Sequence, residues 1–253
     1  MHTPNPAYDE LRLLLVQIRE SEEVAKHELG ALLEVSGLPE YAVWTWNMVL
    51  EGELAWNRVA AVDGVIIGGA GVHSATNDDD FTDNLIDTIR RIADEEKPLF
   101  GSCYGHQIVA RALGGEVITD EDSAEVGCHD VTLTDACEGD DVFGGLWASG
   151  QHTFPALMGH RDRVSVLPEG GVELATTPVC PNQAYRIAEH PIWTTQFHVE
   201  LTPKTLVERL ERYADIYAPG DDTLQKLEAE LRPVPECGAL LGAFLDVCVR
   251  SAR

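Results

Sequence analysis

Apolar and polar positions along the first half of the chain predict strands and helices in turn. Short apolar runs predict buried strands at residues 11–18, 41–46, 63–67 and 99–102. Between them, helical spacing and boundary residues predict helices at residues 22–35 and 81–95. Strands that alternate with helices form parallel sheets through right-handed crossovers, with helices on both faces. The pattern therefore predicts an α/β fold, a three-layer α/β/α sandwich around a mostly parallel central sheet.

The second half of the chain has a different pattern. Short strands and turns over residues 117–197 predict an antiparallel extension of the sheet. Beyond about Pro219, residues 223–231 and the stretch from Leu240 to Cys248 show helical apolar spacing. These helices either pack on the domain's own core or offer a docking surface for a second subunit. We expect one domain over residues 1–218 and a C-terminal helical appendage over residues 219–253.

Cys103 lies at the sharpest predicted turn, between the strand that ends near Ser102 and a helix that Gly114 and Gly115 stop. Gly101 and Gly105 flank it and permit a tight backbone. This is the arrangement of a nucleophile elbow, with sulfur in place of the serine oxygen. A thiol at a helix N-terminus lies at the positive end of the helix dipole, which favours its thiolate. Cys103 is therefore a candidate nucleophile, although such turns are most often only turns.

His198 and Glu200 lie two residues apart at the end of a predicted strand over residues 192–200. Residues i and i+2 of a strand project to the same side, so Glu200 can orient the His198 imidazole toward a sulfur on another strand. A histidine near a carboxylate is more often structural than catalytic. Together with the cysteine turn, the pair nevertheless favours a Cys103–His198–Glu200 triad.

Several motifs, in their order along the chain, resemble those of class I (triad) glutamine amidotransferases, including the glutaminase part of GMP synthases. They are the glycine loop at Gly68 and Gly69, the cysteine turn, the segment 159–170 and the residues 196–200. The resemblance covers roughly residues 10–215. It implies a flavodoxin-like sandwich and glutamine hydrolysis through a cysteine thioester, with no cofactor.

The resemblance also implies roles for individual residues. Cys103 attacks the amide carbon, His198 transfers protons and Glu200 orients His198. The backbone N–H groups of Tyr104 and Gly69 match the oxyanion donors, Gln107 matches a residue of the glutamine pocket, and Gly159 and His160 lie in the segment that closes its other side. Two positions depart from the family pattern, since Val199 and Ala70 stand where proline is usual.

Composition narrows the function classes. The chain has 253 residues, is 44% hydrophobic and carries 43 acidic against 18 basic residues, a net charge of −25. An acidic soluble protein and a protein adapted to high salt both fit this balance, and we favour the second. Nucleic-acid binding is not expected without a phosphate-neutralising surface. No apolar run is long enough to span a membrane, so we expect a cytoplasmic protein with six reduced cysteines. We expect no metal site, because the spacing of Cys128, His129 and Cys137 is not that of zinc ligands.

Three functions remain at this point. The first is a glutamine amidotransferase that passes ammonia to an acceptor enzyme; without a phosphate-binding loop in the chain, we expect the synthetase to be a separate polypeptide. The second is a free-standing γ-glutamyl hydrolase with the same triad. The third, which the intact triad argues against, is a non-catalytic binding subunit.

Overall fold

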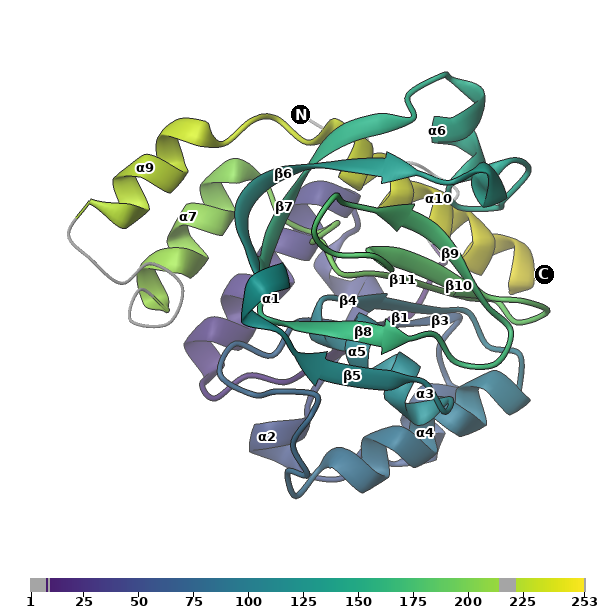
Figure 1. Cartoon of the computed structure of the whole chain (residues 1–253). Coiled ribbons are helices and arrows are strands. Elements are labelled where there is room, and N and C mark those ends of the chain that lie inside the picture. The colour runs from purple at the N-terminus through teal and green to yellow at the C-terminus, as the bar shows by residue number, and fades with distance from the viewer. Residues whose placement is uncertain (1–7, 9, 214–221, 253) are drawn as a thin grey trace.

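Nine strands form the central sheet of the computed structural model, which describes residues 8, 10–213 and 222–252. The strand order is β2-β1-β3-β4-β11-β10-β9-β6-β7. The parallel part of the sheet comprises β1 (Leu13–Gln17), β2 (Val43–Asn47), β3 (Gly64–Ile67), β4 (Leu99–Ser102) and β11 (Ile192–Thr195). The antiparallel part comprises β10 (Ala184–Ile187), β9 (Gly171–Thr176), β6 (Glu125–Leu133) and β7 (Thr153–His160). The predicted parallel sheet with an antiparallel extension is confirmed (Figure 1).

The helices and a small second sheet complete the chain. The longer helices are α1 (Glu22–Ser36), α4 (Thr82–Asp94), α5 (Tyr104–Ala112), α7 (Pro203–Arg212), α9 (Thr223–Glu230) and α10 (Pro235–Ser251). Short helices are α2 (Met48–Glu51), α3 (Trp56–Ala60), α6 (Gly144–Ala148) and the 3-10 turns η2 (Glu40–Ala42), η3 (Glu121–Ser123) and η4 (Asp135–Cys137). β5 (Glu116–Thr119) and β8 (Asp162–Val166) pair antiparallel, apart from the main sheet.

Alternate side chains of β1 enter two separate apolar layers, which makes the fold a three-layer sandwich. Leu13 and Leu15 pack in the layer that holds α1 and α10, whereas Leu14 and Val16 pack in the layer that holds α4 and α5. Because both faces of the strand are covered, all five residues of β1 are buried. Three adjacent parallel strands, β3, β4 and β11, end at the same edge of the sheet. The loops that follow them are therefore the expected place for a functional site.

Most predicted element bounds in the first half of the chain agree with the structure to within a few residues. Ser21 caps α1 through its hydroxyl, and Gly37, at φ 68°, ends it. The strand predicted from residue 41 begins only at Val43, because η2 takes up the residues before it. The strand predicted over residues 192–200 ends at Thr195, so His198 and Glu200 do not extend from a regular strand.

The C-terminal helices pack against the core, as one of the two alternatives predicted. Phe244 of α10 is fully buried, with its ring centroid 5.3 Å from that of Phe100 in β4. Leu224 and Leu227 of α9 are partly buried against the same core, and α9 lies beside α7 (Figure 1). The boundary predicted between residues 218 and 219 lies outside the described residues.

Candidate active site

Cys103 occupies the elbow between β4 and α5 with a backbone conformation that few side chains adopt. Its φ is 54° and its ψ is −104°, and its N–H donates to the Thr195 carbonyl at 2.8 Å. The flanking glycines are required by close approach, because a Cβ on Gly101 would lie 2.6 Å from the Gly105 carbonyl oxygen, and one on Gly105 would lie 2.1 Å from that of Ile67. The strained turn is thus fixed by packing on both sides, as a nucleophile elbow requires.

His198 and Glu200 follow β11, the strand next to β4, and their side chains meet. His198 Nδ1 donates to Glu200 Oε1 at 2.7 Å, and the His198 N–H donates to the Leu157 carbonyl at 2.9 Å. The second oxygen of Glu200 accepts from the Ser102 hydroxyl at 2.9 Å. The sequence placed this pair on a strand, but a bridge to β7 and side-chain hydrogen bonds position it instead.

The electrostatics of the pair favour a charged imidazole. Burial by itself lowers the pKa of His198, but the Glu200 carboxylate and a hydrogen bond to Cys103 outweigh it and raise that pKa to about 9. Burial raises the pKa of Glu200, but His198 and Arg209 lower it well below its usual range. At neutral pH the arrangement therefore supports a carboxylate and an imidazolium next to the sulfur.

The glycine loop after β3 closes the site from the other side. The Gly105 N–H donates to the Gly68 carbonyl at 3.1 Å, which ties this loop to the first turn of α5. A Cβ on Gly69 would lie 3.3 Å from His198 Cε1 and 3.8 Å from Cys103 Cβ, so Gly69 borders both side chains. The Tyr104 N–H is the first of α5 and has no helical acceptor. Gly69 and Tyr104 therefore both border Cys103.

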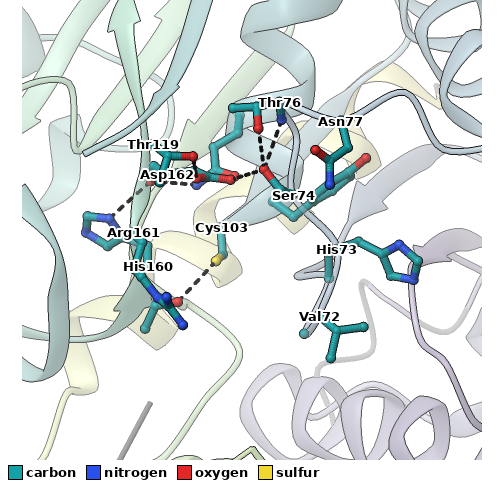
Figure 2. A pocket seen from close by; sticks show the side chains of 15 residues that line it. Val72, His73, Ser74, Thr76, Asn77, Cys103, Thr119, His160, Arg161 and Asp162 are labelled. Carbon is teal, nitrogen blue, oxygen red and sulfur yellow. Dashed lines mark hydrogen bonds between the residues drawn. The ribbon is translucent and has the colours of Figure 1, made fainter. Parts of the chain in front are cut away.

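A pocket of about 390 Å³ opens in front of Cys103 (Figure 2). The predicted residues Tyr104, Gln107, Gly159 and His160 all line it. Gln107 Nε2 donates to the Asp162 carbonyl at 2.8 Å, and the Cys103 thiol lies 3.9 Å from the Gly159 carbonyl oxygen. The elbow, α5, the loop after β3 and the turn between β7 and β8 therefore all line the pocket.

The rim of this pocket is polar, and no sequence pattern predicted it. Asp162 accepts hydrogen bonds from Ser74 at 2.5 Å and from Thr119 at 2.6 Å, as Figure 2 shows. These contacts join the loop after β3 to β5 and β8, which lie far from that loop in the sequence. The small second sheet thus completes the pocket.

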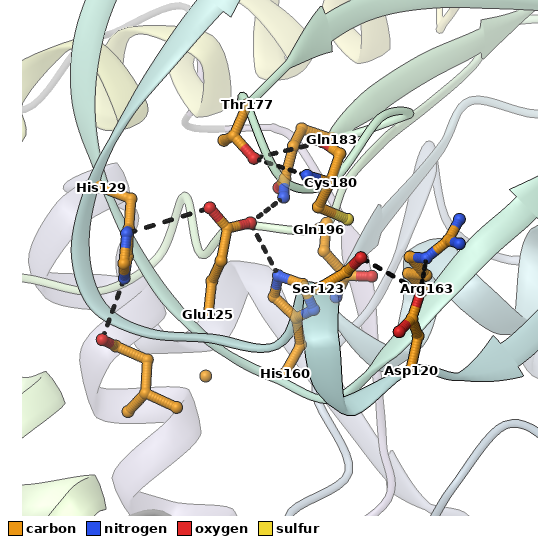
Figure 3. Close-up of polar contacts among 12 residues, drawn as sticks. Asp120, Ser123, Glu125, His129, His160, Arg163, Thr177, Cys180, Gln183 and Gln196 are labelled. Atoms are coloured by element: carbon orange, nitrogen blue, oxygen red, sulfur yellow. Dashed lines mark hydrogen bonds and ion pairs between the residues drawn. The ribbon is translucent and has the colours of Figure 1, made fainter.

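His160 lines the pocket and also belongs to a buried cluster of polar side chains (Figure 3). Its Nδ1 donates to the Asp162 carbonyl at 3.2 Å, and its Nε2 lies 3.3 Å from Glu125 Oε2, which also accepts from Gln183 at 2.5 Å. The ligand atoms of Glu125, His160 and Cys180 lie within 4.8 Å of one another, so these residues could hold a metal ion. The hydrogen bonds already account for Glu125 and His160. The hydrogen bond from His160 to the Asp162 carbonyl ties this cluster to the pocket rim.

A second, much smaller cavity of about 30 Å³ lies on the His198 side of Cys103. The elbow, the glycine loop and α7 line it together with single residues from β7 and from the segments after β1 and β11. The lining residues are Arg19, Gly69, Ala70, Gly71, Cys103, Gly159, His198, Leu206, Arg209, Leu210 and Tyr213. Sequence reasoning missed Arg209 here. The sequence did contain a signal, because Arg209 lies with Leu206 and Leu210 on the apolar face of an amphipathic helix.

Comparisons with known proteins identify the family of the chain. The family model of class-I glutamine amidotransferases matches residues 32–212. The chain is 38% identical over 124 residues to a glutamine-hydrolysing GMP synthase of Clostridium acetobutylicum, covering 48% of this chain and 22% of that protein. It is 32% identical over 161 residues to the corresponding protein of Shewanella amazonensis, covering 63% and 29%. The chain thus spans less than a third of the length of these relatives.

Solved structures share the fold. A glutamine amidotransferase of Thermotoga maritima superposes with a TM-score of 0.72 at 20% identity, over 94% of this chain and 98% of the other. A Thermoplasma acidophilum protein described as part of a GMP synthase superposes with a TM-score of 0.67 at 18% identity, over 95% and 94%. Among the described residues, no helix is both long and apolar enough to cross a membrane. The chain belongs to the class-I glutamine amidotransferase family, and its sequence is similar to part of GMP synthases.

Proposed function

We propose that the protein hydrolyses the side-chain amide of glutamine through a thioester on Cys103. The observation that carries this proposal is the elbow itself. Cys103 is held at a positive φ between a 390 Å³ pocket and the buried His198–Glu200 pair. The Cys103 thiolate attacks the amide carbon, and the oxyanion that forms accepts hydrogen bonds from the N–H groups of Tyr104 and Gly69.

The proton transfers begin from the protonated form of His198. The imidazolium gives its proton to the amide nitrogen, the carbon–nitrogen bond breaks, and ammonia leaves a glutamyl thioester on Cys103. His198, now neutral, takes a proton from water as the water oxygen attacks the thioester carbon. The thiolate then departs, glutamate is released and the imidazolium is restored. Glu200 remains a carboxylate and stabilises the imidazolium.

The two cavities beside Cys103 suggest one place for the substrate and another for the ammonia that leaves. The substrate pocket and the 30 Å³ cavity share Cys103 and Gly159, but His198 lines only the smaller one. An amide nitrogen that takes its proton from His198 must leave on the His198 side of the sulfur. The small cavity is large enough for ammonia or for the water that replaces it.

The acceptor of ammonia is proposed from the relatives. They are GMP synthases, and this chain matches less than a third of their length. We propose that ammonia passes from this chain to a synthetase on a separate polypeptide in the cytoplasm. The Thermoplasma acidophilum protein of similar fold is described as one subunit of a GMP synthase, which supports such a division between polypeptides.

The test is ammonia release from glutamine and from γ-glutamyl peptides at low and at molar KCl. Cys103→Ala is compared with Cys128→Ala, which removes a partly exposed thiol outside the site. We expect Cys103→Ala to abolish release from glutamine and Cys128→Ala to keep it. Equal release by the wild type and Cys103→Ala would exclude the cysteine mechanism. A strong preference for γ-glutamyl peptides would indicate a free-standing hydrolase instead.

A further inference from the structure

Arg209 is buried beside the triad, and no step of the proposed reaction uses it. It lies on α7, its side chain is 8% exposed, and its Nη1 donates to Glu200 Oε1 at 3.2 Å. That oxygen is the one that accepts from His198 Nδ1 at 2.7 Å, and Arg209 Nη1 lies 3.4 Å from the same Nδ1. The guanidinium therefore stands at the junction between the carboxylate and the imidazole.

The hydrogen bonds of Glu200 are divided among three elements. Ser102 of β4 donates to Oε2, while His198 and Arg209 both donate to Oε1. A strand residue and a helix residue, Ser102 and Arg209, therefore each hold one carboxylate oxygen of Glu200. A carboxylate bound at both oxygens cannot rotate without breaking a charge-assisted hydrogen bond.

Two nitrogen atoms of Arg209 have no partner among the described residues. They are Nε and Nη2, and both are buried. Arg209 also lines the 30 Å³ cavity that Cys103 and His198 share. Buried N–H groups without partners are unfavourable unless water satisfies them, and a cavity of this size holds a water molecule. The same cavity borders Cys103 and His198, so a water in it would lie beside the catalytic pair.

We propose that Arg209 is a positioning residue, which locks Glu200 against His198 and holds the water that hydrolyses the thioester. This inference rests on the proposed function. A purely structural role would end at the ion pair with Glu200. A positioning role also changes the reaction itself, because misaligned groups lower kcat while KM changes little.

Other charged or titratable groups surround His198 and Arg209. They are Cys103 of the elbow, Glu200 after β11, Arg19 and Glu28 of the β1–α1 segment, and Tyr213 at the end of α7. Arg19 and Glu28 form their own buried ion pair at 2.5 Å. Removal of Arg209 leaves this pair intact and removes the cation that contacts Glu200.

The experiment replaces Arg209 in the full chain by Met, Gln and Lys. Arg212→Met is the matched control, because Arg212 lies on the same helix and pairs with Glu23 at the surface. We expect Arg209→Met to lower kcat for glutamine about ten- to a hundredfold with KM within about threefold, since the reacting groups lose alignment after binding. Arg209→Lys should recover part of kcat, and Arg212→Met should leave kcat unchanged. Mass spectrometry of acid-quenched enzyme should show the thioester accumulating in Arg209→Met, because the second step slows.

An independent measurement does not need activity. The His198 imidazole is titrated by NMR, its signal among nine histidines assigned with His198→Asn. In Arg209→Met its pKa should rise by about one pH unit or more, because the neighbouring cation is lost. If that variant does not fold, Arg209→Gln carries the same test. Unchanged kcat and an unchanged titration would overturn the proposal. Absence of glutamine hydrolysis by the wild type would refute the proposed function, while the titration would still test Arg209.

Discussion

Replacing Gly105 by alanine tests whether close backbone packing holds the elbow in place. Gly105 is in the first turn of α5, two residues after Cys103, and crosses the end of β3. A Cβ there would lie 2.1 Å from the carbonyl oxygen of Ile67 and 2.9 Å from its carbonyl carbon. Real Cβ contacts essentially never fall below 3.0 Å, so the two backbones must separate by about 0.9 Å.

The size of the stability loss depends on how easily the backbone at Ile67 can move. Ile67 is fully buried in a central strand, and Gly68 and Gly69 follow it directly. Overpacking of this kind costs about 3 kcal/mol when the neighbour is backbone rather than a flexible side chain, and the better helix propensity of alanine returns about 1 kcal/mol. We therefore expect the free energy of unfolding to fall by about 2 kcal/mol. A displacement near 1 Å between the Tyr104 and Gly69 donors should lower kcat/KM about a hundredfold.

The assay combines urea unfolding with ammonia release from glutamine. Gly30→Ala is the control, since Gly30 lies in α1 and an added Cβ meets nothing within 4 Å. It should stabilise the protein by about 0.5–1 kcal/mol and leave activity unchanged. Wild-type stability and activity in Gly105→Ala would refute the reasoning that close approach fixes the elbow.

Three further changes have defined outcomes. The free energy of unfolding should fall as pH rises from 6.5 to about 9, because folded His198 binds its proton more tightly than the unfolded chain does. His198→Asn should flatten that decline. Parallel stability curves for the wild type and the variant would contradict this prediction. Phe244→Ala should lower stability by about 3–5 kcal/mol if α10 is part of the core, against about 0.5 kcal/mol or less for the half-exposed Leu50→Ala, as urea titrations can show. Raising KCl from millimolar to molar should raise the melting temperature, because salt screens the repulsion within a chain of net charge −25; a constant or falling value would argue against salt adaptation.

Local features of the sequence determined the fold class and the triad hypothesis. Buried parallel strands are continuous apolar runs, and glycines on both sides of Cys103 mark a turn that only small residues allow. His198 and Glu200 are two residues apart, so their contact depends on few backbone angles. Each of these features arises from interactions among residues close together in the chain, so the sequence alone was enough to predict it.

Only the tertiary structure decided which distant side chains complete the site. Asp162 meets Ser74 and Thr119 because the small second sheet folds over the loop after β3, and no local pattern encodes that approach. Arg209 reaches Glu200 because α7 packs its apolar stripe against the edge where β4 and β11 end. Such contacts depend on the summed packing of many elements. The sequence therefore indicated Cys103 as the candidate nucleophile, whereas the packed fold decided which side chains surround it.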